Sequence, residues 1–427
     1  MILLLHILLL AILVFRLKLL QPRQTHPWLI PGIIIIKTIA GFALARFYLS
    51  NYGGGDIQGY LADVKVFNDF FRSDPVRFFR VIIGTYDDQD PVIHIFLSKL
   101  KIWFDSGYNI QYNDARTVIR LHALLSIFSG NNEWVHLIWT NVLSVAGGLA
   151  LMRFFYRSSQ GGKIPTVAYL FFFLPNVFIW TSAILKEPLL LFSMGMTLRY
   201  FQLWNNRRTV TYLLPLLLFL FSFMLIKSFW LLAFIPGLLL WLINAEVKKP
   251  WIVFPTVYFI AMMMVFMAGM LNPVFDMPAI LFGQQLNMWR FAVFMHSGSL
   301  IQPVSFAPTI VSFLKHIPDA FIFGLMHPWP WELAKWYYFP MFLENMVVPV
   351  LCIFCCRKFL SEKTNLTAEV MIGLCAGVII VTVCGFTTPV IGSLVRYRMP
   401  GMLLLGLALL SGLYDESKEK GVPELKN

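Results

Sequence analysis

Long apolar runs recur along nearly the whole sequence, and they constrain the fold more than any other feature. An α-helix needs about 20 predominantly apolar residues to cross a bilayer. Runs near that length lie at about 1–15, 28–49, 134–155, 164–183, 188–204, 210–226, 229–245, 251–271, 337–356, 367–385 and 399–414. Only 13% of the residues are charged, against roughly 25% in a soluble domain. We therefore predict an all-α polytopic membrane protein with about 11 transmembrane helices.

The apolar runs leave no stretch large enough for a separate water-soluble core. We expect a single transmembrane domain over residues 1–414, followed by a short cytoplasmic tail at 415–427. The formal net charge of +12 is scattered among the hydrophobic segments, which argues against a nucleic-acid-binding face. The expected partners are membrane lipids.

Basic residues between the runs indicate the orientation, because cytoplasmic loops are enriched in Lys and Arg. If every second connection is cytoplasmic, those connections contain Arg16, Lys18, Arg23, Arg153, Arg157, Lys163, Arg199, Arg207, Arg208, Lys248, Lys249, Arg357, Lys358 and Lys363. The acids in these connections are Glu246 and Glu362. This register places the N-terminus outside, the C-terminus in the cytoplasm, and the long loops at about 51–132 and 272–336 outside.

Both outside loops contain amphipathic segments that are too polar or too short to span a bilayer. Ile57 to Phe71 and Pro91 to Phe104 can lie flat on the membrane. We interpret Val118 to Phe128 and Pro308 to Met326 as interfacial or re-entrant helices. An aromatic belt is expected at His327, Trp329, Trp331, Trp336, Tyr337 and Tyr338. The outside loops are therefore expected to be structured.

Asp56 follows three glycines just beyond the second run, in the sequence NYGGGDIQGY. Glycines permit positive φ angles and close approach of the backbone, and a carboxylate held there could act as a general base or a metal ligand. The alternative is a helix N-cap, which Asp favours.

Lys186 and Glu187 precede Pro188, which suits the first turn of a helix. A lysine at a helix N-terminus is electrostatically disfavoured unless an anion shares the site. We therefore consider this pair a candidate substrate-binding site. The alternative is a Lys–Glu pair that reaches the membrane interface.

Arg396, Tyr397 and Arg398 come just before another run, on the side assigned as outside. Two arginines there run against the charge rule, and paired guanidinium groups suit bidentate phosphate binding. The alternative is interfacial anchoring.

Lys37 lies near the middle of the second run, and an ionisable residue at that depth indicates function. A buried pair with Glu344 is the alternative. Arg120 and Lys227 belong to the same outer basic set, and His327 is the one histidine that we expect to bind substrate.

The blocks GGGDIQGY, RTVIRLHALLSIFSG, PNVFIWTSAILKEP and VRYRMP together resemble bacterial envelope proteins of the GT-C superfamily of polytopic glycosyltransferases. In that superfamily an acidic residue stands near the start of a large outside loop with two membrane-lying helices, as Asp56 does here. The third block of such proteins often has Ser, Ser and Gly where this chain has Asn176, Thr181 and Ala183. A single Asp56 replaces a paired acidic motif, so the identity of the base and a divalent metal, Mg²⁺ or Mn²⁺, stay open.

The resemblance implies a glycosyltransferase of the bacterial inner membrane. It would transfer a sugar from a polyprenyl-phosphate-linked donor to a glycan or glycolipid acceptor on the periplasmic face. Asp56 would deprotonate the acceptor, with inversion, and Arg396, Arg398, Lys186 and Lys37 would stabilise the leaving phosphate.

Two other functions stay open. A polysaccharide repeat-unit polymerase on lipid-pyrophosphate carriers would need the outer arginines and depend less on Asp56. A lipid or solute transporter or flippase would be favoured by inverted repeats and broken spans, but the sequence has no internal repeat.

Overall fold

Seven helical segments of the described chain are long and apolar enough to cross a membrane, as expected of a polytopic membrane protein. Four are single helices in the first two thirds of the chain: α2 (Leu29–Tyr52), α7 (Glu133–Tyr156), α10 (Val210–Leu232) and α12 (Pro250–Leu271). The other three are Phe339–Lys358, α17 (Ala368–Thr387) and Ile391–Leu413. Of these, Phe339–Lys358 covers α15 (Phe339–Asn345) and most of α16 (Val347–Ser361), and Ile391–Leu413 covers α18 (Ile391–Tyr397) and α19 (Met399–Leu413).

The computed structural model describes residues 2–16, 20, 25–87, 89–103, 113–156, 164–243, 247–332, 336–361 and 366–413. Several predictions fall outside these residues: the tail 415–427, Phe104, and the orientation-setting residues Lys18, Arg23, Arg157, Lys163, Glu246, Glu362 and Lys363. Regular structure in the described part is helical, with one isolated antiparallel bridge between Leu300 and Val390.

The eleven predicted spans are only partly matched. The run at 1–15 corresponds to α1 (Ile2–Arg16), which is apolar but short. The described residues of the run at 229–245 divide between α10 and the short α11 (Ile235–Ile243). Residues 164–183 form a 3₁₀ helix, η1 (Thr166–Phe173), and then α8 (Pro175–Trp180). Pro175 explains that break, because proline lacks an N–H and restricts the residue before it. The count of eleven stays a prediction.

The chain folds as two units, each built from separate stretches. Unit 1 comprises Met1–Phe154 and Phe178–Phe229, and unit 2 comprises Phe155–Val177 and Trp230–Asn427.

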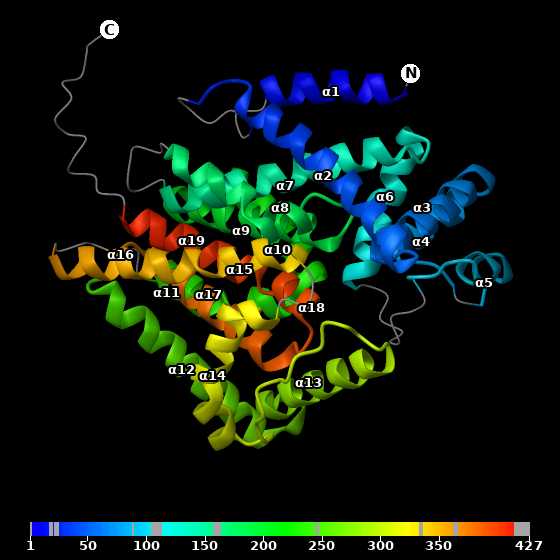
Figure 1. Cartoon of the computed structure of the whole chain (residues 1–427). Coiled ribbons are helices and arrows are strands. Elements are labelled where there is room, and N and C mark those ends of the chain that lie inside the picture. Colours follow the sequence, from blue (N-terminus) through cyan, green and yellow to red (C-terminus); the bar gives the residue numbers. More distant parts are fainter. Residues whose placement is uncertain are drawn as a thin grey trace, which may run out of the picture. The chain divides into compact units, whose positions relative to one another are not determined.

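In unit 1, the first outside loop of the sequence interpretation forms four helices: α3 (Asp56–Ser73), α4 (Pro75–Ile83), α5 (Pro91–Leu97) and α6 (Asp114–Ser129). α3 packs against both α6 and α4 (Figure 1). The predicted helix at Ile57 to Phe71 is confirmed as α3, and the one at Val118 to Phe128 lies within α6. α5 is shorter than predicted, and α4 was not predicted.

The helices α7 and α9 (Lys186–Arg207) of unit 1 approach each other closely. A Cβ atom on Gly195 would lie 2.1 Å from the carbonyl oxygen of Gly147. Small residues permit this kind of backbone contact between membrane helices.

In unit 2, α17 packs against α14 (Ile310–Met326), α19, α13 (Met277–Phe294), α12 and α11. The rings of Phe313 and Phe386 stack at 4.7 Å where α14 meets α17. Pro308 to Met326, predicted as an interfacial or re-entrant helix, is largely α14, which continues through Pro318. Short 3₁₀ helices lie at Pro273–Phe275, Pro330–Glu332 and Trp336–Tyr338.

Candidate functional site

Two lysines from different helices share one carboxylate in unit 1. Lys186 Nζ lies 2.7 Å from Asp114 Oδ2, and Lys227 Nζ lies 3.3 Å from the same oxygen. Asp114 is the first residue of α6, Lys186 is the first residue of α9, and Lys227 interrupts α10 with non-helical angles. The three side chains are 26%, 14% and 26% exposed, so the cluster is mostly but not fully shielded from solvent. We call it the Asp114 cluster.

Helix ends explain why these charges meet. Asn113 caps α6 by accepting a hydrogen bond from the Arg116 N–H at 2.8 Å, which leaves Asp114 in the first turn, where the helix dipole favours an acid. α9 begins without a side-chain cap, and Lys186 at its first position opposes the dipole. The carboxylate of Asp114 offsets this charge, and the buried Glu187 adds an acid to that first turn.

Asp114 is held in its charged form. Burial would raise the pKa of this carboxyl, but the charges of Lys186 and Lys227, and hydrogen bonds from both, outweigh burial and hold the pKa well below its usual range. The carboxylate is therefore ionised at neutral pH.

Two further cations lie on the same helix, α6. The guanidinium groups of Arg116 and Arg120 lie over the ring of Trp103, at 5.2 and 4.8 Å from its centroid. Both side chains are buried, and Arg116 Nε donates to the Trp103 carbonyl at 3.1 Å. α6 thus places Arg120, a predicted site residue, beside Arg116 over the Trp103 ring.

Asp63 fixes the turn that carries Trp103. Its buried carboxylate accepts backbone N–H bonds from Lys101, Ile102 and Trp103 at 2.7, 3.0 and 3.0 Å. Burial raises the pKa of Asp63, and these hydrogen bonds oppose the rise.

Asp56 is the first residue of α3, directly after the glycine turn. Gly53 and Gly54 have φ angles of 67° and 131°, which strain other residues. Gly55 occupies the N-cap position, so the alternative in which Asp56 is the N-cap is wrong. Asp56 is half-buried. Its role as a base stays a prediction.

Lys37 is fully buried in α2, and its ammonium donates to Thr181 Oγ1 at 2.6 Å. The ammonium also lies 5.9 Å from the centroid of the Phe178 ring. The alternative partner named from the sequence, Glu344, belongs to unit 2, where its Oε2 accepts the backbone N–H of Asn176 at 2.6 Å.

The predicted arginine pair of unit 2 differs in its surroundings. Arg398 is fully buried and donates to the carbonyl oxygen of Gly324 and to Asn345 Oδ1. Arg396 and Tyr397, at the end of α18, are partly exposed. Arg398 thus has acceptors inside the protein, and its phosphate-binding role stays a prediction.

His327 lies at the end of α14 with its Nδ1 atom 2.7 Å from Glu332 Oε2, and its ring stacks on Phe323. Burial lowers the pKa of His327, as does the charge of Arg398, whereas Glu332 opposes the shift. The nearby rings of Trp329 and Trp331 stack at 5.2 Å.

Sequence reasoning missed Asp114, Arg116 and Glu332 as members of these sites. The pattern Asn113-Asp114 before an amphipathic stretch signals a helix start, but not which side chains approach it. Within the described residues, no group of three His, Cys, Asp or Glu side chains is placed to hold a metal ion. The metal requirement therefore stays open.

No family model matches this chain, and no curated protein or solved structure matches it. The GT-C resemblance accordingly stays a prediction from the sequence blocks.

Proposed function

We propose that the chain is a membrane glycosyltransferase that takes a sugar from a polyprenyl-phosphate-linked donor. The acceptor is a glycan or glycolipid on the periplasmic face of the bacterial inner membrane. The observation that supports this proposal best is the Asp114 cluster, in which two lysines predicted to bind substrate lie within 3.3 Å of the same oxygen atom.

A leaving lipid phosphate carries the charge that develops in the transition state, and preorganised cations stabilise it. Lys186 and Lys227 supply two such cations at a partly exposed position, and α9 adds the positive end of its dipole. Asp114 positions both ammonium groups. In this scheme the lysines bind the phosphate of the donor.

Of Asp56 and Asp114, Asp56 is better suited to act as the general base. Asp114 is engaged by two lysines and its pKa is held low, so it accepts a proton poorly. Asp56 follows a turn with positive φ angles and is half-buried, which leaves part of its side chain open to an acceptor.

The test is mass spectrometry of lipid-linked intermediates and surface glycans in a deletion strain complemented with variants. Asp56→Asn and Lys186→Met should each abolish transfer of one sugar, whereas Asp69→Asn, an exposed acid on α3, should restore it. Normal glycan with both site variants would overturn the proposal.

The same experiment distinguishes the alternatives. A single-repeat glycan in the deletion strain, with activity retained in Asp56→Asn, would identify a polymerase. An unchanged lipid-linked profile combined with movement of a substrate between leaflets by the purified protein would identify a transporter.

A further inference from the structure

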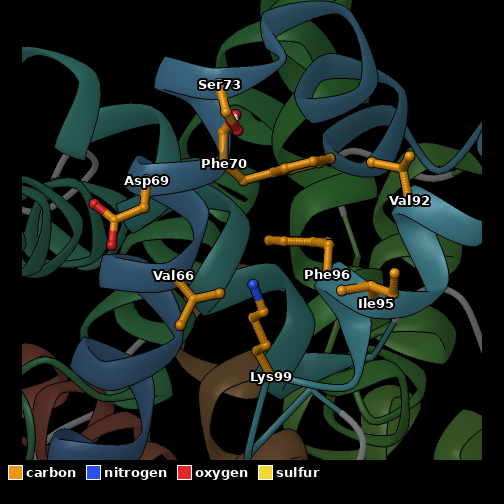
Figure 2. Close-up of a pocket in the computed structure, with 8 residues that line it drawn as sticks. All are labelled: Val66, Asp69, Phe70, Ser73, Val92, Ile95, Phe96 and Lys99. Atoms are coloured by element: carbon orange, nitrogen blue, oxygen red, sulfur yellow. Dashed lines mark hydrogen bonds between the residues drawn. The ribbon is translucent and has the colours of Figure 1, made fainter.

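A cavity of about 350 Å³ lies between α3 and α5 in unit 1 (Figure 2). This volume falls within the range of small-molecule sites, about 300–1,000 Å³. The walls are mainly apolar side chains, and they include Val66, Phe70, Val92, Ile95 and Phe96. The rings of Phe70 and Phe96 stack at 4.0 Å and join the two helices.

One cation, the exposed Lys99, lines this apolar space. Figure 2 shows the side chain of Lys99 extending between Val66 and Phe96, while the carboxylate of Asp69 points away from it. The Ser73 hydroxyl donates to the Phe70 carbonyl at 3.0 Å, so it is already bonded. Among the residues that the structure describes, the Lys99 ammonium has no hydrogen bond or ion pair.

Exposed apolar side chains lie on the lining helix α5 and on the neighbouring α4. Val92 and Ile95, which line it, are 43% and 58% exposed. On α4, Val76, Phe79 and Ile83 are exposed at the spacing of one helix face, with Arg80 also exposed beside them. Aliphatic and aromatic groups with interspersed bases are typical of a helix at a lipid interface.

One ion pair connects α4 to α5. Arg77 of α4 bonds Asp74 at its own N-terminus and Asp90, which caps α5, with both distances at 2.7 Å. This ion pair therefore joins α4, with its exposed apolar face, to α5, which lines the cavity.

We propose that this cavity binds an anionic phospholipid, whose acyl chain contacts Phe70, Ile95 and Phe96 and whose phosphate pairs with Lys99. A water-soluble anion would gain nothing from the apolar walls. A zwitterionic lipid carries its own cation and so pairs less well with a lysine. The bound lipid anchors α3, α4 and α5 to the membrane surface, and this role is independent of glycosyl transfer.

The test uses the purified full-length protein and native mass spectrometry in the presence of phosphatidylglycerol or phosphatidylcholine. Lys99→Gln should lower phosphatidylglycerol occupancy about fivefold, since one basic residue near an anionic surface contributes about 1 kcal/mol. Lys65→Gln is the matched control, because Lys65 is an exposed lysine of α3 outside the cavity. Ile95→Asn should weaken binding of both lipids.

Three results would overturn the proposal. Equal occupancy in Lys99→Gln and wild type would exclude pairing with Lys99, and equal retention of the two lipids would exclude charge selection. Displacement of phosphatidylglycerol by an equal amount of polyprenyl phosphate would reassign the cavity to the sugar donor. Loss of sugar transfer in Asp56→Asn bears only on the proposed function, so the two proposals fail separately.

Discussion

Removing the carboxylate of Asp114 should destabilise unit 1 by leaving two ammonium groups close together. The distances of 2.7 and 3.3 Å to one oxygen limit the separation of the Lys186 and Lys227 nitrogens to about 6 Å. At an effective dielectric constant of about 20, two unit charges at that distance repel by about 3 kcal/mol. In the wild type the attraction of Asp114 for both lysines offsets this repulsion. In Asp114→Asn the repulsion is left uncompensated, so we expect that variant to lower the free energy of unfolding by about 3 kcal/mol.

The assay is thermal unfolding in detergent, followed by intrinsic fluorescence. For a unit of this size, 1 kcal/mol corresponds to about 2–4 °C, so Asp114→Asn should lower the Tm by about 6–12 °C. Lys186→Met removes one of the two repelling charges, so the double variant Asp114→Asn, Lys186→Met should be more stable than Asp114→Asn alone. Asp69→Asn, an exposed acid, should leave the Tm unchanged.

Additivity would refute this reasoning. If the effects of Asp114→Asn and Lys186→Met add within about 0.5 kcal/mol, the two residues do not interact energetically.

The pKa of Asp114 also predicts how its contribution depends on pH. The unfolded-state pKa of an aspartate is about 4, and the folded-state pKa of Asp114 lies below it. Such a carboxyl stabilises the fold fully at any pH above its unfolded-state pKa. The contribution is lost only as the pH falls below 4 through the folded-state pKa. The Tm difference between wild type and Asp114→Asn should therefore be constant from pH 8 to pH 5, and a decrease over that range would contradict the assigned pKa direction.

Two further predictions concern packing and local hydrogen bonds in unit 1. Gly195→Ala should lower the Tm sharply, because the new Cβ would lie 2.1 Å from the backbone oxygen of Gly147. Gly32→Ala is the control, because its new Cβ would meet nothing within 4 Å, and it should leave the Tm unchanged. Equal Tm values for the two variants would contradict the close contact of α7 and α9. Asp63→Asn replaces one accepting oxygen with a donor, so it should cost about 1–3 kcal/mol and raise amide exchange at residues 101–103. Unchanged exchange there would show that Asp63 does not hold the turn.

Hydropathy predicted most of the membrane helices because lipid exposure leaves a direct record in composition. The remaining runs did not give single long helices where a run is broken internally, as at Pro175, or where the helix is short, as in α11. α4 could have been found, because Asp74 and Pro75 form a helix start and Gly84 follows its end. The boundaries between the two units could not have been predicted from the sequence, because the stretch Phe155–Val177 belongs to the same unit as a later part of the chain.

The candidate site was only partly predictable for a related reason. Lysines at helix starts or kinks, such as Lys186, can be recognised by their unfavourable position in the helix dipole. Their partner Asp114 lies 72 residues away from Lys186, and no local pattern encodes that contact. Arg398 was likewise singled out because a basic residue on the predicted outer side runs against the charge rule. The acceptors that allow its guanidinium to be buried come from α14 and α15, and no local pattern indicates them.

The acceptors of each cation decide which of them suits an incoming phosphate. Arg398 is fully buried and donates to Gly324 and Asn345, so a ligand would have to break two internal bonds and enter a closed site. Lys186 and Lys227 are partly exposed, so a ligand can approach both ammonium groups without entering a closed site. On these grounds we propose that phosphate binds at the Asp114 cluster and not at Arg398, so Lys227→Met should weaken donor binding; an unchanged donor affinity would contradict this assignment.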